Sequence, residues 1–90
     1  MELSDLRREI DTIDGEILNL FCQRMEIAAK IADYKQAHQL PVLVPEREKE
    51  VLEAVAQKAG PDMAQYAIRL FETIMAQSRN YQRIRLGTDK

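Results

Sequence analysis

The first third of the chain carries apolar residues at alternating spacings of three and four. This apolar stripe consists of Leu3, Leu6, Ile10, Ile13, Ile17, Leu20, Ile27, Ile31 and Tyr34. Such a spacing places all of these side chains on one face of an α-helix. The pattern therefore predicts one long helix over about residues 4–38, with Ser4 or Asp5 as its N-cap.

Two shorter helices are predicted in the rest of the chain. Pro45 suits the first turn of a helix, which is expected over about residues 45–59. Gly60 is a natural stop for that helix. A third helix is expected over about residues 62–84, with Pro61-Asp62 at its start. Because strand-type alternation is nearly absent, the chain is predicted to be all-α.

The predicted first helix is too long for one small domain to cover. About 33 residues at 1.5 Å each give a length of roughly 50 Å, whereas a compact chain of this size has a radius of gyration near 13 Å. A second copy of the chain would shield the uncovered part of the stripe from water. We therefore expect three helices in one domain of residues 1–90, which forms an intertwined two-fold homodimeric bundle.

Composition and charge narrow the classes of function. The net charge of −2 at pH 7 argues against a nucleic-acid or membrane partner. One cysteine excludes an intrachain disulfide and a cysteine metal cluster, and any histidine site would depend on His38 alone. We expect no metal and no cofactor. No apolar run reaches transmembrane length and no signal peptide is visible, so the cytoplasm is the expected location.

Polar residues interrupt the inward faces of all three predicted helices. Arg24 occupies a position in the apolar stripe, and Lys35 lies about three turns further on nearly the same face. Glu48 lies on the apolar face of the second helix, and Ser78 and Gln82 continue that of the third. Each can be explained singly as an interface ion pair, a solvated charge, a helix-dipole partner or a packing pair. Together they indicate one polar site inside the helical bundle.

Arg7 suggests that this site is shared between two chains. Arg7 and Arg24 lie about 25 Å apart along one helix and on different faces. They cannot hold one small ligand from the same chain. An antiparallel two-fold partner would bring Arg7 of one copy to Arg24 of the other.

The order of these residues resembles the all-helical chorismate mutases, the type II family, which is fused to prephenate dehydratase in some proteins. The likeness spans roughly residues 3–84. It rests on the segments Leu6-Arg7-Arg8-Glu9-Ile10-Asp11, Ile13-Asp14, Arg24, Ala32-Asp33-Tyr34-Lys35, Pro41-Val42, Glu46-Arg47-Glu48, Ser78 and Gln82. No single segment is specific, but the ordered set at matching spacings is.

The resemblance implies that the protein rearranges chorismate to prephenate in phenylalanine and tyrosine biosynthesis, and it implies four catalytic residues. Arg24 would bind a substrate carboxylate. Lys35 and Gln82 would donate hydrogen bonds to the ether oxygen whose bond breaks, and Glu48 would accept one from the ring hydroxyl. This set suits an intramolecular rearrangement of a dianion, which needs cations and fixed donors but no nucleophile, metal or proton shuttle.

The resemblance also implies three substrate-binding residues. Arg7 would reach into the partner's site across the dimer interface. Arg47 would complete the cationic cluster, and Ser78 would help to hold a carboxylate. The chain departs from the family pattern at Val44, where many relatives have an aspartate, and this position affects how the ring hydroxyl is held.

Two other functions stay open at this point. Relatives with a similar cationic pocket act as isochorismate–pyruvate lyases, and only a test with both substrates separates the two reactions. Alternatively, the chain is a non-catalytic helical dimerisation module, in which Arg24 only pairs with a carboxylate across the interface. Such a module would bind no small dicarboxylate.

Overall fold

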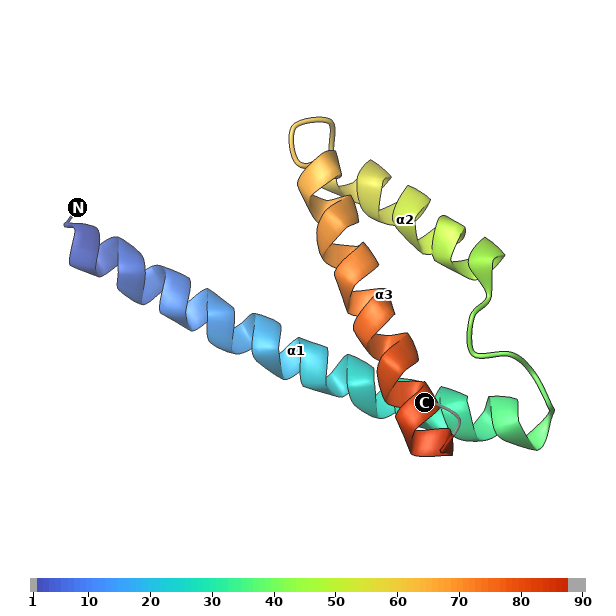
Figure 1. Cartoon of the computed structure of the whole chain (residues 1–90). Helices are drawn as coiled ribbons and strands as arrows, with labels where there is room; N and C mark the ends of the chain where they lie inside the picture. The colour runs from blue at the N-terminus through green and yellow to red at the C-terminus, as the bar shows by residue number, and fades with distance from the viewer. Residues whose placement is uncertain (1, 88–90) are drawn as a thin grey trace.

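The computed structural model of the protein describes residues 2–87, which form three α-helices and no strand (Figure 1). The helices are α1 at Leu3–Ala37, α2 at Pro45–Ala59 and α3 at Ala64–Leu86. Within the described residues, α1 and α2 each pack against α3 but not against each other. The predicted all-α fold with one very long helix is therefore confirmed.

The N-cap of α1 is Glu2, so the predicted cap at Ser4 or Asp5 was wrong. Asp5 lies instead at the third helical position, where its Oδ2 accepts a hydrogen bond from the Glu2 N–H at 3.3 Å. Its carboxylate is also placed favourably at the positive end of the helix dipole. Asp5 thus stabilises the N-terminal end of α1 as a residue of the first turn rather than as the N-cap.

α3 begins two residues later than predicted. Gly60, with a φ of 84°, ends α2, and residues 61–63 form a turn before the next helix. The Gly60 carbonyl accepts hydrogen bonds from the Met63 and Ala64 N–H groups at 3.2 and 2.9 Å. This turn separates Pro61 from the helix proper, which starts at Ala64.

α3 also extends two residues beyond its predicted end. It continues to Leu86 and is capped by Gly87, which adopts the left-handed conformation with a φ of 71°. Arg85 in this last turn pairs with Asp33 of α1, with Nε–Oδ1 and Nη2–Oδ2 distances of 2.9 Å each. The hydrogen bond from Arg85 lowers the pKa of Asp33. This contact attaches the end of α3 to α1.

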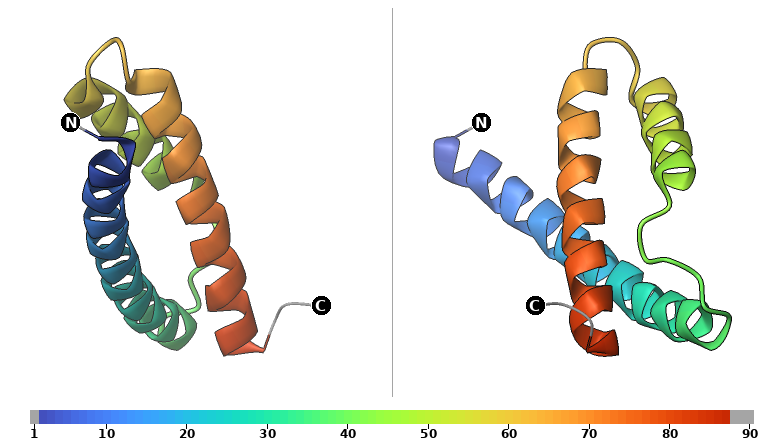
Figure 2. Two further views of the ribbon diagram at one scale, coloured as in Figure 1. Left: turned by 90° about the vertical axis from the view of Figure 1, so that its left-hand side faces the viewer. Right: turned by 45° about the vertical axis from the view of Figure 1, so that its right-hand side comes forward.

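The core of the single chain lies where α3 crosses the C-terminal half of α1 (Figure 2). Its buried apolar residues are Ala28, Ala29, Ala32 and Met75. Alanines on α1 allow the two helix backbones to approach closely, and Ala32 has no exposed surface (0%). The crossing therefore leaves little room for a larger side chain at this position.

The N-terminal half of α1 lies outside this core and extends away from α2 and α3 (Figure 1). The described residues span 54 Å along their longest axis, with a radius of gyration of 16.1 Å, whereas a compact chain of about 100 residues has a radius of gyration near 13 Å. Every residue of the predicted apolar stripe is 44% to 62% exposed. The single chain therefore leaves the apolar face of its longest helix uncovered.

Ala32→Leu is expected to lower the free energy of unfolding by about 1–3 kcal/mol, because the added methyl groups overpack the α1–α3 crossing. Ala54→Leu is the matched control, since Ala54 is exposed on α2 and leucine is nearly as good a helix former as alanine. Urea unfolding followed by circular dichroism at one protein concentration measures both. Equal effects of the two substitutions would contradict tight packing at Ala32.

Candidate active site

A cavity of about 500 Å³ lies between the three helices and the segment that connects α1 to α2. Its wall consists of Arg24, Ile27, Ala28, Ile31, Lys35, Val42, Val44, Arg47, Glu48, Val51, Met75, Ser78, Arg79 and Gln82. A cavity of this size is typical of small-molecule sites. The fold thus gathers six of the seven predicted site residues around one cavity of a single chain, all except Arg7.

The charged residues of the cavity wall are mostly cationic. They are Arg24, Lys35, Arg47, Arg79 and Glu48. Arg24 is partly buried and has no ion-pair or hydrogen-bond partner among residues 2–87. Four cations against one carboxylate make the cavity attractive to an anion with more than one negative charge.

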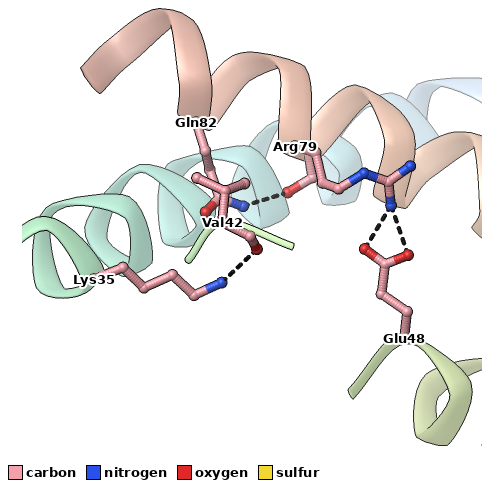
Figure 3. Close-up of polar contacts among 6 residues, drawn as sticks. Lys35, Val42, Glu48, Arg79 and Gln82 are labelled. Carbon is pink, nitrogen blue, oxygen red and sulfur yellow. Dashed lines mark hydrogen bonds and ion pairs between the residues drawn. The ribbon is translucent and has the colours of Figure 1, made fainter. Parts of the chain in front are cut away.

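Lys35 is held by the segment between α1 and α2. Its Nζ donates a hydrogen bond to the Val42 carbonyl at 2.8 Å (Figure 3). Burial lowers the pKa of Lys35, and the negative charge of Glu48 opposes this effect. The lysine therefore loses its proton at a lower pH than a fully solvated lysine would.

Glu48 of α2 is paired with Arg79 of α3. The Arg79 Nη1 donates to both carboxylate oxygens, at 2.6 Å from Oε1 and 2.5 Å from Oε2 (Figure 3). Each side chain is 25% exposed. The pair joins α2 to α3 at the cavity and offsets the negative charge of Glu48.

Arg79 was missed by the sequence analysis, although a signal for it was present. The cavity-lining residues of α3 are Met75, Ser78, Arg79 and Gln82. Their spacing of i, i+3, i+4 and i+7 defines one helix face. Because Ser78 and Gln82 had been placed on the inward face, the same periodicity predicts that Arg79 lies there too.

Ser78 and Gln82 are buried on α3, each with 6% of its surface exposed. The Gln82 Nε2 donates a hydrogen bond to the Ser78 Oγ at 3.1 Å. The Gln82 Oε1 is buried and has no hydrogen-bond partner within the described part of the chain. A buried acceptor without a partner is costly, so this amide is a point of the wall where a further contact would stabilise the site.

Arg47 and Arg7 are less enclosed than the other predicted residues. The Arg47 side chain is 71% exposed, and its Nη1 lies 3.3 Å from the Glu50 Oε1, so Arg47 borders the cavity. Arg7 is exposed on the N-terminal half of α1 and does not line the cavity. A single chain therefore does not bring Arg7 to the site.

The described residues offer neither a metal centre nor a membrane-spanning helix. Residues 2–87 contain no group of three or more histidines, cysteines, aspartates or glutamates arranged to hold a metal ion. None of the helices in this range is long and apolar enough to cross a membrane. What the cavity wall offers a ligand is a set of cations, one carboxylate, one amide and one hydroxyl on an apolar background.

Comparison with known proteins found relatives that are much longer than this chain and others of similar length. The T-protein of Haemophilus influenzae is 40% identical over 74 residues, which are 77% of this chain and 20% of that protein. The bifunctional chorismate mutase/prephenate dehydratase of Aquifex aeolicus is 48% identical over 54 residues, 60% of this chain and 15% of that protein. The chain therefore spans a fifth or less of the length of these two relatives.

A shorter relative aligns over most of both chains. The 4-amino-4-deoxychorismate mutase of Streptomyces venezuelae is 32% identical over 79 residues, 84% of this chain and 76% of that protein. No solved structure gave a significant match. The chorismate mutase type II family matches residues 6–83, a range that includes all seven predicted site residues. The resemblance inferred from the sequence is thereby confirmed, and the chain belongs to the type II chorismate mutase family.

Proposed function

We propose that this protein is a chorismate mutase that rearranges chorismate to prephenate. The observation that carries the proposal is the cavity lined by Lys35, by the buried amide of Gln82 and by Arg24, which has no partner among the described residues, in a chain of the type II family. Chorismate is a dicarboxylate, and the excess of cations suits its charge. The cytoplasmic location expected from the sequence stays a prediction.

Substrate binding would depend first on Arg24. Its guanidinium has no partner in the described chain, and its planar fork of donors matches a carboxylate. Ser78 and Arg47 lie on the same cavity wall and would contact the second carboxylate. Holding both carboxylates would fold the flexible side chain of the substrate over its ring, which removes much of the orientational cost of the reaction.

Lys35 and Gln82 would stabilise the charge that builds on the ether oxygen as its bond to carbon breaks. An ammonium has three N–H donors, so Lys35 can keep its contact with the Val42 carbonyl and donate to substrate as well. Gln82 would turn its amide so that Nε2 faces the cavity. The Ser78 hydroxyl would then donate to Oε1, which gives that buried oxygen the partner it lacks.

Glu48 would accept a hydrogen bond from the ring hydroxyl. A carboxylate has about four acceptor positions, and Arg79 Nη1 occupies one on each oxygen of Glu48. Val44, also on the cavity wall, has no polar side-chain atom to offer. Glu48 is thus the acidic side chain of the wall that is available to the hydroxyl.

The working unit would be an antiparallel two-fold homodimer. The exposed apolar stripe of α1 supports this, because a second copy would bury it. The same geometry would carry Arg7 of one chain to the cavity of the other. Each site would then combine Arg7 of one chain with Arg24 and Lys35 of its partner.

The purified protein is expected to convert chorismate to prephenate with a higher kcat/KM than any release of pyruvate from isochorismate. Arg24→Ala and Lys35→Ala should each lower kcat/KM by about 10²- to 10³-fold, because each removes a charge-assisted contact to the transition state. Lys30→Ala is the control, since Lys30 is exposed on α1 and does not line the cavity. Loss of chorismate absorbance, product identification and circular dichroism measure activity and folding.

Three outcomes of this assay would contradict the proposal. Pyruvate release from isochorismate at a higher kcat/KM than chorismate turnover would favour the lyase. No turnover and no binding of small dicarboxylates would favour the dimerisation module. Near-parental activity of both alanine variants would show that Arg24 and Lys35 are structural.

The pH profile should show that the donor at position 82 cannot titrate. We expect kcat/KM to be nearly flat from about pH 5.5 to 8, and Gln82→Glu to shift activity towards acid, because a carboxyl group donates only when protonated. Above this range activity should decline as Lys35 loses its proton, earlier than for an ordinary lysine, since burial lowers its pKa. A parental profile that falls steeply above about pH 6 would count against Gln82 as the donor.

The shared site predicts recovery of activity when two inactive variants are mixed. Sedimentation should first show a species of twice the chain mass. Arg7→Ala and Arg24→Ala homodimers should both be nearly inactive, because each lacks one arginine at every site. After subunit exchange, half of the dimers are mixed and carry one intact site, so about a quarter of parental activity should return.

Mass-tagged chains would verify that exchange has taken place. Arg24→Ala mixed with Lys35→Ala is the matched control, because both lesions then fall on residues of one cavity wall and every site keeps one lesion. This control should stay inactive. Exchange without recovery in the first mixture would show that Arg7 and Arg24 do not meet across the interface.

A further inference from the structure

We propose that Arg79 is a positioning residue that sets substrate specificity: by offsetting the charge of Glu48, it adapts the site to a neutral hydroxyl group rather than an ammonium on the substrate ring. This inference rests on the proposed function. It starts from the charges that surround Glu48. The Arg79 Nη1 donates to both oxygens of its carboxylate, and Glu48 also acts electrostatically on Lys35.

The charge of Glu48 presents a difficulty for a site that binds a dianion. Without a compensating cation, a partly buried carboxylate on the cavity wall would repel both carboxylates of the substrate. Arg79 removes most of this repulsion, since its guanidinium is always charged and lies within hydrogen-bond distance. It also fixes the carboxylate from the α3 side and leaves other acceptor positions free.

The same compensation determines which ring substituent Glu48 can favour. A ring hydroxyl can donate a hydrogen bond to the carboxylate whether or not a cation compensates the charge of that carboxylate. An amino group is mostly protonated near neutral pH. The attraction between this ammonium and Glu48 would be much weaker when Glu48 is paired with Arg79 and close to Lys35 than when its charge is uncompensated. No other acidic residue of the described chain lines the cavity, and Val44 supplies no charge.

A relative of this chain shows that the distinction is relevant. The Streptomyces venezuelae protein is named as a mutase of 4-amino-4-deoxychorismate, whose name specifies an amino group in place of a hydroxyl. Removal of Arg79 would leave the full negative charge of Glu48 next to the ring substituent, whether hydroxyl or amino group. The variant should then lose affinity for chorismate and gain relative preference for the amino compound.

The test compares kcat/KM for the two substrates in the parent and in Arg79→Gln. We expect the ratio of amino to hydroxyl substrate to rise by about tenfold or more, and the loss on chorismate to fall mainly on KM, because charge repulsion acts on ground state and transition state alike. Arg85→Gln is the matched control. It breaks another arginine–carboxylate pair, with Asp33, outside the cavity, and should leave the ratio unchanged.

A double variant separates compensation from direct substrate binding. In a Glu48→Gln background the carboxylate charge is already absent, so adding Arg79→Gln should leave KM for chorismate within about threefold of that of Glu48→Gln alone. The double variant contains no unpaired charge at the pair, so it also serves if Arg79→Gln alone does not fold. A KM of the double variant about tenfold or more above that of Glu48→Gln alone would show that Arg79 contacts substrate itself, and would overturn the proposal.

Two further results bear on the inference. A ratio in folded Arg79→Gln within about twofold of the parent would overturn it while leaving the mutase function intact. A parent protein that turns over neither substrate would overturn the proposed function, and this inference with it.

Discussion

The close crossing of α1 and α3 is the contact on which the rest of the structure depends. Alanines 28, 29 and 32 remove the side-chain bulk that would hold the two helices apart. Polar residues near the crossing then line one cavity. They are Arg24 and Lys35 of α1 and Ser78 and Gln82 of α3. α2 packs against α3 and not against α1, and Glu48–Arg79 is one of the contacts between α2 and α3.

Much of this arrangement could be predicted from the sequence because helices have one dominant period. The apolar stripe predicted the length of α1. The polar residues Arg24 and Lys35, which interrupt the inward face of α1, predicted one wall of the cavity. The same period also places Arg79 on the inward face, but arginine is mostly solvent-exposed in proteins, so the residue type alone does not single it out. The Val42 carbonyl could not be predicted at all, because its contact with Lys35 depends on the path of an irregular segment.

The cavity also holds groups that weaken the chain when no ligand is bound. Among residues 2–87, Arg24 is partly buried without a counter-charge, and the Gln82 Oε1 is buried without a donor. Such features are common where a protein trades stability for function. A bound dianion would supply the missing counter-charge. Its acceptor atoms would also receive the amide Nε2 of Gln82 once Ser78 donates to Oε1. Ligand binding and folding stability are therefore coupled at this site.

The uncovered apolar face of α1 has a consequence for how the amount of protein relates to the amount of activity. If complete sites exist only in dimers, their number grows with the square of the chain concentration while the chains are dilute. Activity would then rise more steeply than expression, and a cell that makes few chains would have almost no flux through the reaction. Because α1 requires a second chain to cover it, the activity in a cell would depend on a minimum level of expression.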